Sequence, residues 1–493
     1  MTSGATLPSA GEGGIQSPFR LRRYVLIALA LATGLGARAW LVELSPRYGY
    51  LGDHDDYVRW GIQAADSGLT ALYTGPPPRA RHVVHRDDGT TALRTRTVDR
   101  VLNYPPVSAC LLWWQGEIYK AVADERLVNT RTSRRLYAVL PVLCDIILAF
   151  GCLAIVRHLA PRWASLAFAA AFLAPPLAID SALWGQTDSW LLAPTIWMIW
   201  AMMRGRWVLA GVLWGVALGV KPQAVLFTPV WCLALLLTNR RGRVLLGAVM
   251  AVAVLNVAAA PFWLTSGANW LRESFVGNIV HGYPHTTLKA FNLWYIDLLC
   301  TEELSASASL LGFAKDEWGR LLTAVGLVAA FGIIYRRWRS APMAICLFSG
   351  LVLLVCVMLP TRVHERYIVL CLPFLICAAC RNRRLWLGLV ALLTVASFQV
   401  TWYVWSTRLA GGASESQLRA YYAAQADKLK LPEPSRQRHI DRQTQRELAD
   451  RAKDRPLEWG LTTAGLVSFL LIFLAAALPA GTRDGKIRAS GAG

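Results

Sequence analysis

Residues 243–264 read RVLLGAVMAVAVLNVAAAPFWL, an apolar stretch with no charged residue after Arg243. A segment of this length and composition is typical of a helix that crosses a lipid bilayer. Such stretches recur from residue 24 to residue 478, which predicts an all-α, polytopic membrane protein. We place about twelve transmembrane helices at residues 24–42, 134–157, 163–181, 185–203, 207–220, 222–238, 243–264, 317–335, 341–360, 366–380, 384–405 and 457–479.

The composition agrees with this prediction. Of the 493 residues, 55% are hydrophobic and only 17% are charged, a balance that soluble globular proteins rarely reach. The formal net charge is +20, but the basic residues are spread over short loops between the spans. This spread argues against nucleic acid as a partner. It fits affinity for membrane lipids, or for an anionic substrate such as a lipid phosphate.

Arginine placement predicts the orientation. If the N-terminus is cytoplasmic, every second loop should be basic, and the loops after spans 2, 4, 6, 8 and 10 all are. The clusters are Arg157 and Arg162; Arg204 and Arg206; Arg240, Arg241 and Arg243; Arg336, Arg337 and Arg339; and Arg381, Arg383 and Arg384. Since the composition is also rich in Arg and Ala, we expect a bacterial inner (plasma) membrane protein.

The long connections therefore lie on the extracytoplasmic side. We expect four parts: a disordered cytoplasmic tail (1–23), a transmembrane module (24–405), a charged extracytoplasmic loop (406–458), and a last transmembrane helix with a cytoplasmic tail (459–493). The first extracytoplasmic loop, at about 43–133, contains apolar-aromatic stretches that predict amphipathic helices on the membrane surface.

An acidic motif, Gly52-Asp53-His54-Asp55-Asp56-Tyr57, opens this first loop. Three carboxylates within four residues repel one another, so they should not all be comfortably ionised. A carboxylate that accepts a proton readily suits a general base acting on a hydroxyl. Asp53, Asp55 and Asp56 are therefore candidate catalytic residues, with a solvated acidic turn or a divalent-cation site as the alternatives.

Two polar motifs on the same side offer contacts for a sugar or an acceptor. Tyr104 precedes two prolines that fix an extended backbone before the next helix. The alternative is that these prolines only mark the start of that helix. Trp184-Gly185-Gln186-Thr187-Asp188 stands at the mouth of the predicted fourth span. Its Trp offers a flat face, and its Gln and Asp can bind hydroxyls; a polar helix start is the simpler alternative.

Cations mark two further junctions on this side. Lys221, in Lys221-Pro222-Gln223, lies between apolar runs, where a cation is costly unless it snorkels or meets an anion. In the segment 362–367, RVHERY, the two Arg and the His can neutralise a phosphate, and Glu365 can orient one of them. Interfacial snorkelling is the alternative. Because motifs hundreds of residues apart share one membrane face, a common site is favoured.

In order along the chain, these motifs resemble those of the C-type (GT-C) glycosyltransferases, polytopic enzymes that use polyprenyl-phosphate sugars. The chain looks similar to the dolichyl-phosphate-glucose glucosyltransferases of N-glycan precursor assembly and to bacterial GPI-mannosyltransferase-related proteins. The resemblance rests on Gly52-Asp53, Tyr104-Pro105-Pro106, Lys221 with Gln223, Asn292 with Trp294, and His364-Glu365. Eukaryotic glucosyltransferases tend to have His-x-His-Glu-Lys at the last motif, where this chain has Arg-Val-His-Glu-Arg, so glucose and mannose both stay open.

The resemblance implies an inverting hexosyltransferase, glucosyl- or mannosyl-, that uses a polyprenyl-phosphate sugar on the extracytoplasmic side, with Asp53 as the base. The donor phosphate would be held by Lys221, Arg362, His364 and Arg366. The sugar or acceptor would be contacted by Tyr104, Trp184, Gln186, Asp188, Gln223, Asn292, Trp294 and Glu365. No cofactor is required and no metal site is predicted, although a divalent cation (Mg or Mn) could bind the carboxylates. The acceptor could be a glycan, a lipid or a protein.

A transporter or flippase of a lipid-linked sugar is the alternative function. It predicts charged residues at the bilayer midplane and internal sequence repeats, and neither is clear in this sequence.

Overall fold

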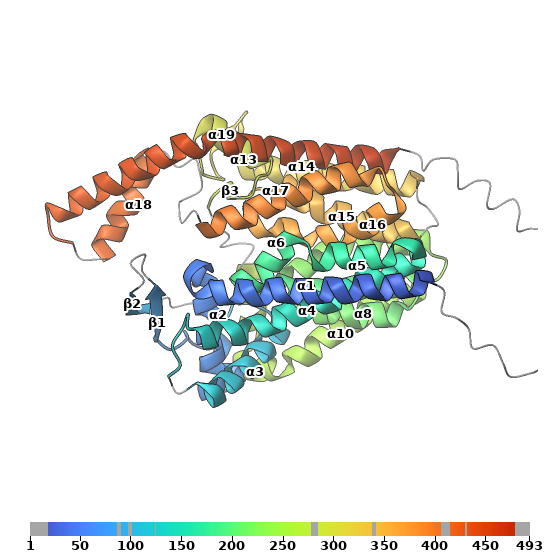
Figure 1. Cartoon of the computed structure of the whole chain (residues 1–493), viewed down its shortest axis with the longest axis horizontal. Helices are drawn as coiled ribbons and strands as arrows, with labels where there is room; N and C mark the ends of the chain where they lie inside the picture. The colour runs from blue at the N-terminus through green and yellow to red at the C-terminus, as the bar shows by residue number, and fades with distance from the viewer. Residues whose placement is uncertain are drawn as a thin grey trace, which may run out of the picture.

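The computed structural model describes residues 18–85, 90–96, 101–123, 125–277, 284–337, 342–405, 415–428 and 431–478. Its long helices lie side by side along one direction (Figure 1). The α-helices are α1 (Pro18–Tyr48), α2 (Leu51–Ser67), α3 (Pro106–Val122), α4 (Arg131–Leu159), α5 (Ala164–Phe172), α6 (Pro175–Ala178), α7 (Asp188–Met203), α8 (Trp207–Val220), α9 (Thr228–Leu237), α10 (Arg241–Ser266), α11 (Asn269–Leu271), α13 (Leu293–Thr301), α14 (Lys315–Arg337), α15 (Pro342–Met358), α16 (Leu372–Arg381), α17 (Leu385–Trp405), α18 (Glu415–Lys428) and α19 (Ser435–Ala477).

Shorter elements join these helices. The 3₁₀ and π turns are η1 (Leu69–Tyr73), η2 (Pro161–Trp163), η3 (Ile179–Trp184), η4 (Pro222–Phe227), η5 (Arg272–Val276) and η6 (Glu365–Leu370). The strands are β1 (Ala80–His85), β2 (Thr91–Arg96), β3 (Thr287–Leu288), β4 (Ser309–Leu310), β5 (Phe313–Ala314) and β6 (Val363–His364). They form small two-stranded sheets: β1 with β2 and β4 with β5 are antiparallel, and β3 with β6 is parallel.

Several of these helices have the length and composition of membrane spans. In the described chain, five qualify singly, namely Leu21–Tyr48, Arg131–Leu159, Arg241–Ser266, Lys315–Arg337 and Ala452–Ala477. Residues Pro161–Phe172 and Pro175–Trp184 form a sixth candidate, bent by 45°. Shorter apolar helices occupy other predicted spans, including Trp207–Val220 and Pro342–Met358. The chain is therefore an integral membrane protein, whereas the number of about twelve spans stays a prediction.

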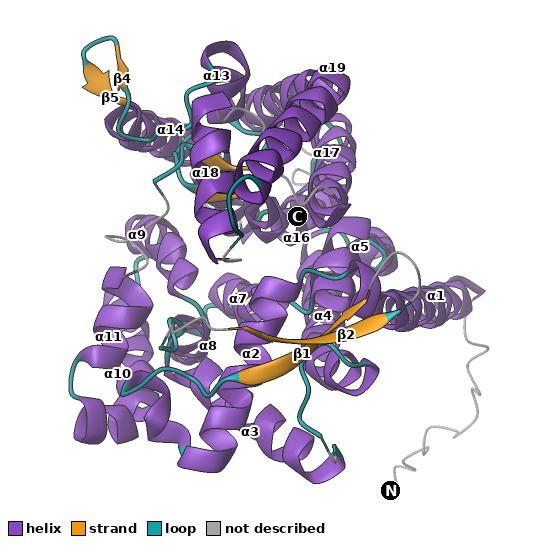
Figure 2. Cartoon of the chain, turned by 90° about the vertical axis from the view of Figure 1, so that its left-hand side faces the viewer, coloured by secondary structure: helices purple, strands orange, loops and turns teal. Residues whose placement is uncertain are grey.

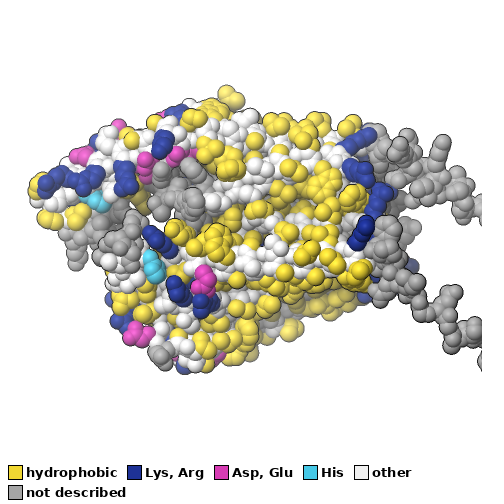
Figure 3. Space-filling model, in the orientation of Figure 1, with side chains coloured by type: hydrophobic (Ala, Val, Ile, Leu, Met, Phe, Trp, Pro, Cys, Tyr) yellow, Lys and Arg dark blue, Asp and Glu magenta, His cyan; other side chains and the backbone are white. Residues whose placement is uncertain are grey.

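The two ends of the bundle differ in charge. On the face drawn in Figure 3, apolar side chains cover the middle, and Lys and Arg gather at the end where α1 begins. The opposite end carries basic, acidic and His side chains together. This pattern is the one expected if α1 begins at a cytoplasmic surface. Of the predicted tails and charged loop, residues 1–17, 406–414, 429–430 and 479–493 lie outside the described residues.

The long first loop builds much of the opposite end. There α3 follows Pro105, and a β1–β2 hairpin, which the all-α prediction did not include, runs across α2 in the view of Figure 2. Short strands of mixed polarity resemble a polar loop in hydropathy, so the pattern did not reveal them. Helices α2 and α3 touch backbone to backbone: a Cβ on Gly116 would lie 2.0 Å from the carbonyl oxygen of Gly61.

Lys221 separates two helices that fold back on each other. Its backbone is extended (φ −149°, ψ 136°) between the end of α8 and η4. The Trp214 indole donates a hydrogen bond to the Ala224 carbonyl and stacks on Trp231, with ring centroids 5.1 Å apart. Helices α8 and α9 therefore form a hairpin with Lys221 at its tip.

Candidate active site

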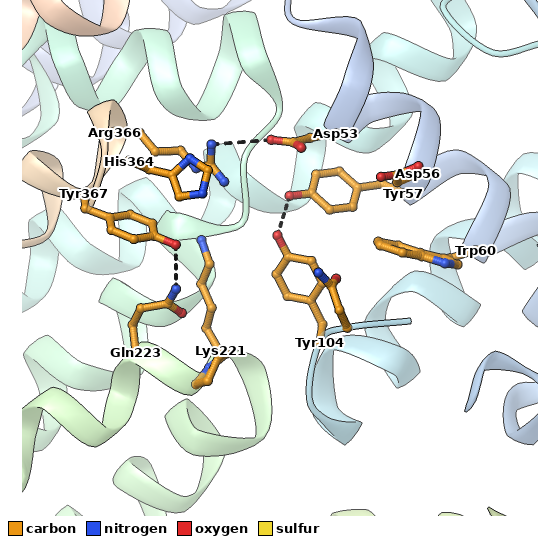
Figure 4. Close-up of a pocket in the computed structure, with 12 residues that line it drawn as sticks. Asp53, Asp56, Tyr57, Trp60, Tyr104, Lys221, Gln223, His364, Arg366 and Tyr367 are labelled. Carbon is orange, nitrogen blue, oxygen red and sulfur yellow. Dashed lines mark hydrogen bonds and ion pairs between the residues drawn. The ribbon is translucent and has the colours of Figure 1, made fainter. Parts of the chain in front are cut away.

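A single pocket gathers most of the predicted motifs. It has about 570 Å³ of empty space, part of it open to solvent. Four segments build it: α2, the residues before α3, the tip of the α8–α9 hairpin, and the junction of β6 with η6 (Figure 4). The lining residues are Asp53, Asp56, Tyr57, Trp60, Asn103, Tyr104, Lys221, Pro222, Gln223, His364, Arg366 and Tyr367.

Asp53 forms the acidic end of the pocket. Its side chain is 27% exposed, so a ligand can reach it. Its Oδ2 accepts a hydrogen bond from Nε2 of Gln186 at 2.5 Å. The Gln186 carbonyl in turn accepts from the Tyr57 hydroxyl at 3.0 Å, and that hydroxyl lies 2.9 Å from the hydroxyl of Tyr104. The hydrogen bond from Gln186 thus holds the Asp53 carboxylate in place, while the carboxylate still lines the pocket.

Tyr57 serves this chain of hydrogen bonds as a neutral group. Burial, followed by the neighbouring Tyr104 and Asp53, raises its pKa well above the usual 10.0. A phenol that keeps its proton can donate to Gln186 throughout the physiological pH range. Because the Tyr57 hydroxyl donates to the Gln186 oxygen, the oxygen of the amide faces Tyr57 and its NH₂ group faces Asp53.

The basic end is an ion-pair cluster around Asp188, at the start of α7. Nζ of Lys221 donates to Oδ1 of Asp188 at 2.6 Å, and Nε of Arg366 lies 3.4 Å from Oδ2. The Arg366 fork also lies 3.3 Å from Oε1 of Glu365 and 3.6 Å from Oδ2 of Asp53. Asp188 and Glu365 are fully buried, whereas both cations line the pocket.

Aromatic and amide groups complete this end. Gln223 donates to the Tyr367 hydroxyl at 2.8 Å, and the His364 ring stands 5.2 Å from the Tyr367 ring. Nζ of Lys221 lies 6.0 Å from the ring centres of both Tyr104 and Tyr367, a cation–π distance. The cations are therefore held by aromatic rings and carboxylates, and both side chains line the pocket (Figure 4).

The arrangement suits a substrate with an anionic group and a hydroxyl. Carboxylates fix the cations in place, so little reorganisation is needed when an anion meets them. Of the three predicted acidic residues, Asp53 and Asp56 line the pocket, and a hydroxyl placed beside Asp53 could lose its proton there. Across the described ranges, no group of three His, Cys, Asp or Glu is arranged to hold a metal ion.

Some predicted site residues lie away from the pocket lining. Asp55 is buried on the other side of α2, with an oxygen 3.7 Å from Arg59. Arg362 adopts φ 62° and lies 3.5 Å from Asp316, and Trp184 is buried against Tyr50. Asp55, Arg362 and Trp184 are not among the residues that line the pocket, so its geometry does not support the roles predicted for them.

Asn292 and Trp294 join α13 to the end of α15. The Asn292 amide donates to the carbonyls of Val357 and Pro360, and its oxygen accepts from the Trp294 backbone N–H. The Trp294 indole donates to the Leu359 carbonyl at 2.7 Å. Both side chains are buried and hold the backbone just before the 362–367 segment. Their contacts are structural, although they position the basic end of the pocket.

Several pocket residues escaped the sequence reasoning. Tyr57 and Tyr367 stood at the ends of quoted motifs, next to the charged residues that attracted attention. Asn103 likewise adjoins Tyr104, while Trp60 lies one helical turn after Asp56. The signal available was helical spacing, since residues 53, 56, 57 and 60 fall on one face of a helix.

No curated protein matches the sequence. Two crystal structures of ArnT from Cupriavidus metallidurans are similar: the apo state (16% identity, 93% of this chain, 76% of that chain, TM-score 0.45) and the undecaprenyl phosphate complex (17%, 92%, 76%, 0.44). Their TM-scores are below 0.5, so they do not establish a common fold. The profile of glycosyltransferase family 87 matches residues 103–360, more than half of the chain. The chain therefore belongs to glycosyltransferase family 87.

Proposed function

We propose that this glycosyltransferase moves a hexose from a polyprenyl-phosphate donor to an acceptor hydroxyl, with inversion, on the extracytoplasmic side of the membrane. The observation that carries the proposal is the polarity of the pocket: an accessible carboxylate, Asp53, at one end and two cations, Lys221 and Arg366, at the other. Transfer from a lipid-phosphate sugar needs a base for the acceptor hydroxyl and positive charge beside the leaving phosphate, both close to the anomeric carbon.

In the proposed reaction, Asp53 accepts the proton of the acceptor hydroxyl as its oxygen bonds to the anomeric carbon. The bond between that carbon and the phosphate oxygen breaks, and polyprenyl phosphate leaves with the electron pair. Lys221 and Arg366 offset the negative charge that develops on the leaving oxygen, with His364 beside them. A single displacement of this kind inverts the anomeric centre and needs no covalent sugar–enzyme intermediate.

The same groups explain why the proposed reaction needs no cofactor. A monophosphate leaving group carries less charge than a diphosphate, and Asp188 holds two buried cations in the part of the pocket where we propose that it binds. A divalent cation, Mg or Mn, is therefore an optional partner in this proposal. The acceptor hydroxyl would approach from the side of Asp56 and Trp60, opposite the cations (Figure 4).

The test is a reconstituted assay with purified protein in lipid nanodiscs. A panel of polyprenyl-phosphate sugars, including glucose and mannose, is supplied with candidate acceptors, and donor consumption and product anomer are measured. We expect one donor to be consumed and an inverted linkage to form. Consumption of a nucleotide sugar in place of every lipid-linked donor would overturn the proposal, and so would a retained anomeric configuration. Passage of donor across the bilayer without transfer would favour the transporter alternative.

A further inference from the structure

One buried carboxylate outside the pocket, Asp145 on α4, binds groups from three other elements. Its exposure is 2%. Nε and Nη2 of Arg38, on α1, lie 2.8 and 2.7 Å from Oδ2. The Ser181 hydroxyl, on η3, donates to the same oxygen at 2.6 Å, and the Ser189 hydroxyl, on α7, donates to Oδ1. A single side chain therefore gathers α1, η3 and α7 around α4.

The two serines flank the turn that reaches the active site. Between Ser181 and Ser189 lie Gln186, which binds Asp53, and Asp188, which binds Lys221 and Arg366. Gly185 sits in the left-handed region (φ 71°), and the backbone N–H of Gln186 closes onto the Asp180 carbonyl at 3.0 Å. Asp145 therefore binds both ends of the turn that carries Gln186 and Asp188.

Arg38 in turn fixes Asp145. Its Nη1 donates to the carbonyls of Phe172 and Gly34, and its guanidinium carbon lies 4.2 Å above the Phe172 ring. A buried ion pair is a costly way to gain stability, since desolvation of two charges offsets much of their attraction. Ionisable groups within membrane spans more often serve function. Here the Asp145 carboxylate accepts hydrogen bonds from the hydroxyls of Ser181 and Ser189, which flank the turn next to the pocket.

We propose that Asp145, held by Arg38, is a positioning residue for the active site: it closes the 181–189 turn so that Asp188 and Gln186 reach their partners at once. The consequence for catalysis rests on the proposed function, whereas the geometric part can be tested without any substrate. If the turn loosens, the ion pair between Asp188 and Lys221 weakens, and the Lys221 amine spends more time free.

The first experiment measures how readily the Lys221 amine reacts with a labelling reagent. Ser189→Ala removes one contact of Asp145, and Asp145→Asn removes its charge. Thr195→Val is the matched control, because its hydroxyl lies on the same helix and donates only to the Leu191 and Leu192 carbonyls. Each protein, full length in nanodiscs, is treated with formaldehyde and cyanoborohydride, and mass spectrometry follows methylation of each lysine. Lys315, a buried lysine 2.5 Å from Asp297, is the internal reference.

We expect Lys221 to be methylated about fivefold faster in Ser189→Ala and Asp145→Asn, the effect of losing about one hydrogen bond, with Thr195→Val and Lys315 unchanged. Faster labelling of both Lys221 and Lys315 would show general loosening and overturn the positioning role. An unchanged Lys221 rate in Ser189→Ala would overturn it as well, even if Asp145→Asn fails to fold.

The second experiment asks for the catalytic consequence. Ser189→Ala should raise the donor KM several-fold while kcat changes less, because Asp188 holds the cations that bind the phosphate. Equal loss in Thr195→Val, or an unchanged donor KM in Ser189→Ala, would overturn the inference. If the wild type shows no transfer from any lipid-linked donor, the proposed function fails, and the labelling result still decides the geometric claim.

Discussion

Nη1 of Arg366 lies 3.6 Å from Oδ2 of Asp53, so the basic end of the pocket touches its acidic end directly. The two residues lie far apart in the sequence: Asp53 follows the first predicted span, and Arg366 follows the ninth. The contact is long for a hydrogen bond, and Asp53 stays 27% exposed. A substrate entering between them would separate a carboxylate from a cation and use each for its own task, as base and as phosphate ligand.

Asp53→Asn should fold and insert but lose transfer, because an amide cannot accept the acceptor proton. We expect kcat to fall by about 10²- to 10⁴-fold, measured as product formed from lipid-linked donor in nanodiscs. Asp66→Asn is the matched control on the same helix: Asp66 pairs with Lys120 and Arg126 and does not line the pocket. Robust turnover by Asp53→Asn would remove Asp53 from the role of base.

The paired substitution Lys221→Met with Asp188→Asn tests the phosphate site. Changing both residues avoids leaving a buried charge alone, so the protein should still fold. Losing a charge-assisted contact should raise the donor KM by about 10- to 100-fold, as read from initial rates against donor concentration. Lys315→Met with Asp297→Asn removes a second Lys–Asp pair, in which Lys315 is buried and Asp297 is partly exposed. This pair lies outside the pocket lining, so its loss should leave KM near that of the wild type.

Tyr57→Phe removes the hydroxyl that donates to Gln186. We expect kcat to fall roughly tenfold, since the Gln186 amide is then free to turn away from Asp53. Because burial raises the pKa of Tyr57 well above 10.0, the phenol keeps its proton between pH 6 and about pH 10. The pH profiles of kcat for the variant and the wild type should therefore have the same shape. An alkaline limb that vanishes in Tyr57→Phe would contradict this.

Chelation distinguishes the metal-free mechanism from a metal-assisted one. With Lys221 and Arg366 on the leaving phosphate, activity after EDTA treatment and desalting should stay within about twofold of the untreated value. Loss of activity with EDTA, and its return with Mg or Mn, would show that a divalent cation takes part in the reaction.

His54 predicts how stability depends on pH. It is buried beside Ser133 and Tyr137, and burial, followed by Arg134, lowers its pKa well below the usual 6.5. The unfolded chain therefore binds more protons below pH 6.5, so its contribution is complete above 6.5 and is lost as the pH falls.

We expect the free energy of unfolding to decrease below pH 6.5 by at most about 1.4 kcal/mol per pH unit from this one residue. Thermal unfolding between pH 8 and pH 5 measures it, and His54→Gln should give a flatter curve. A curve as steep in His54→Gln as in the wild type would assign the acid sensitivity to other groups.

The sequence by itself determined the class of the protein. Apolar runs and the arginine clusters predicted a membrane protein and its polar side because water and lipid act on each segment separately, whatever its neighbours are. The same reasoning found Asp53, Lys221 and Arg366, because a charged residue next to an apolar run is conspicuous in one dimension.

Only the tertiary structure decided which polar residues meet. Asp55 and Asp56 are neighbours in sequence, yet Asp56 lines the pocket while Asp55 faces Arg59, since a helix turns successive side chains about 100° apart. The sequence made Asp188 a candidate sugar ligand, and only the structure shows that it is also the buried partner of both cations. The carboxylate of Asp145 and the hydroxyl of Ser189 come from different helices, and a contact between residues so far apart exists only once the helices have packed.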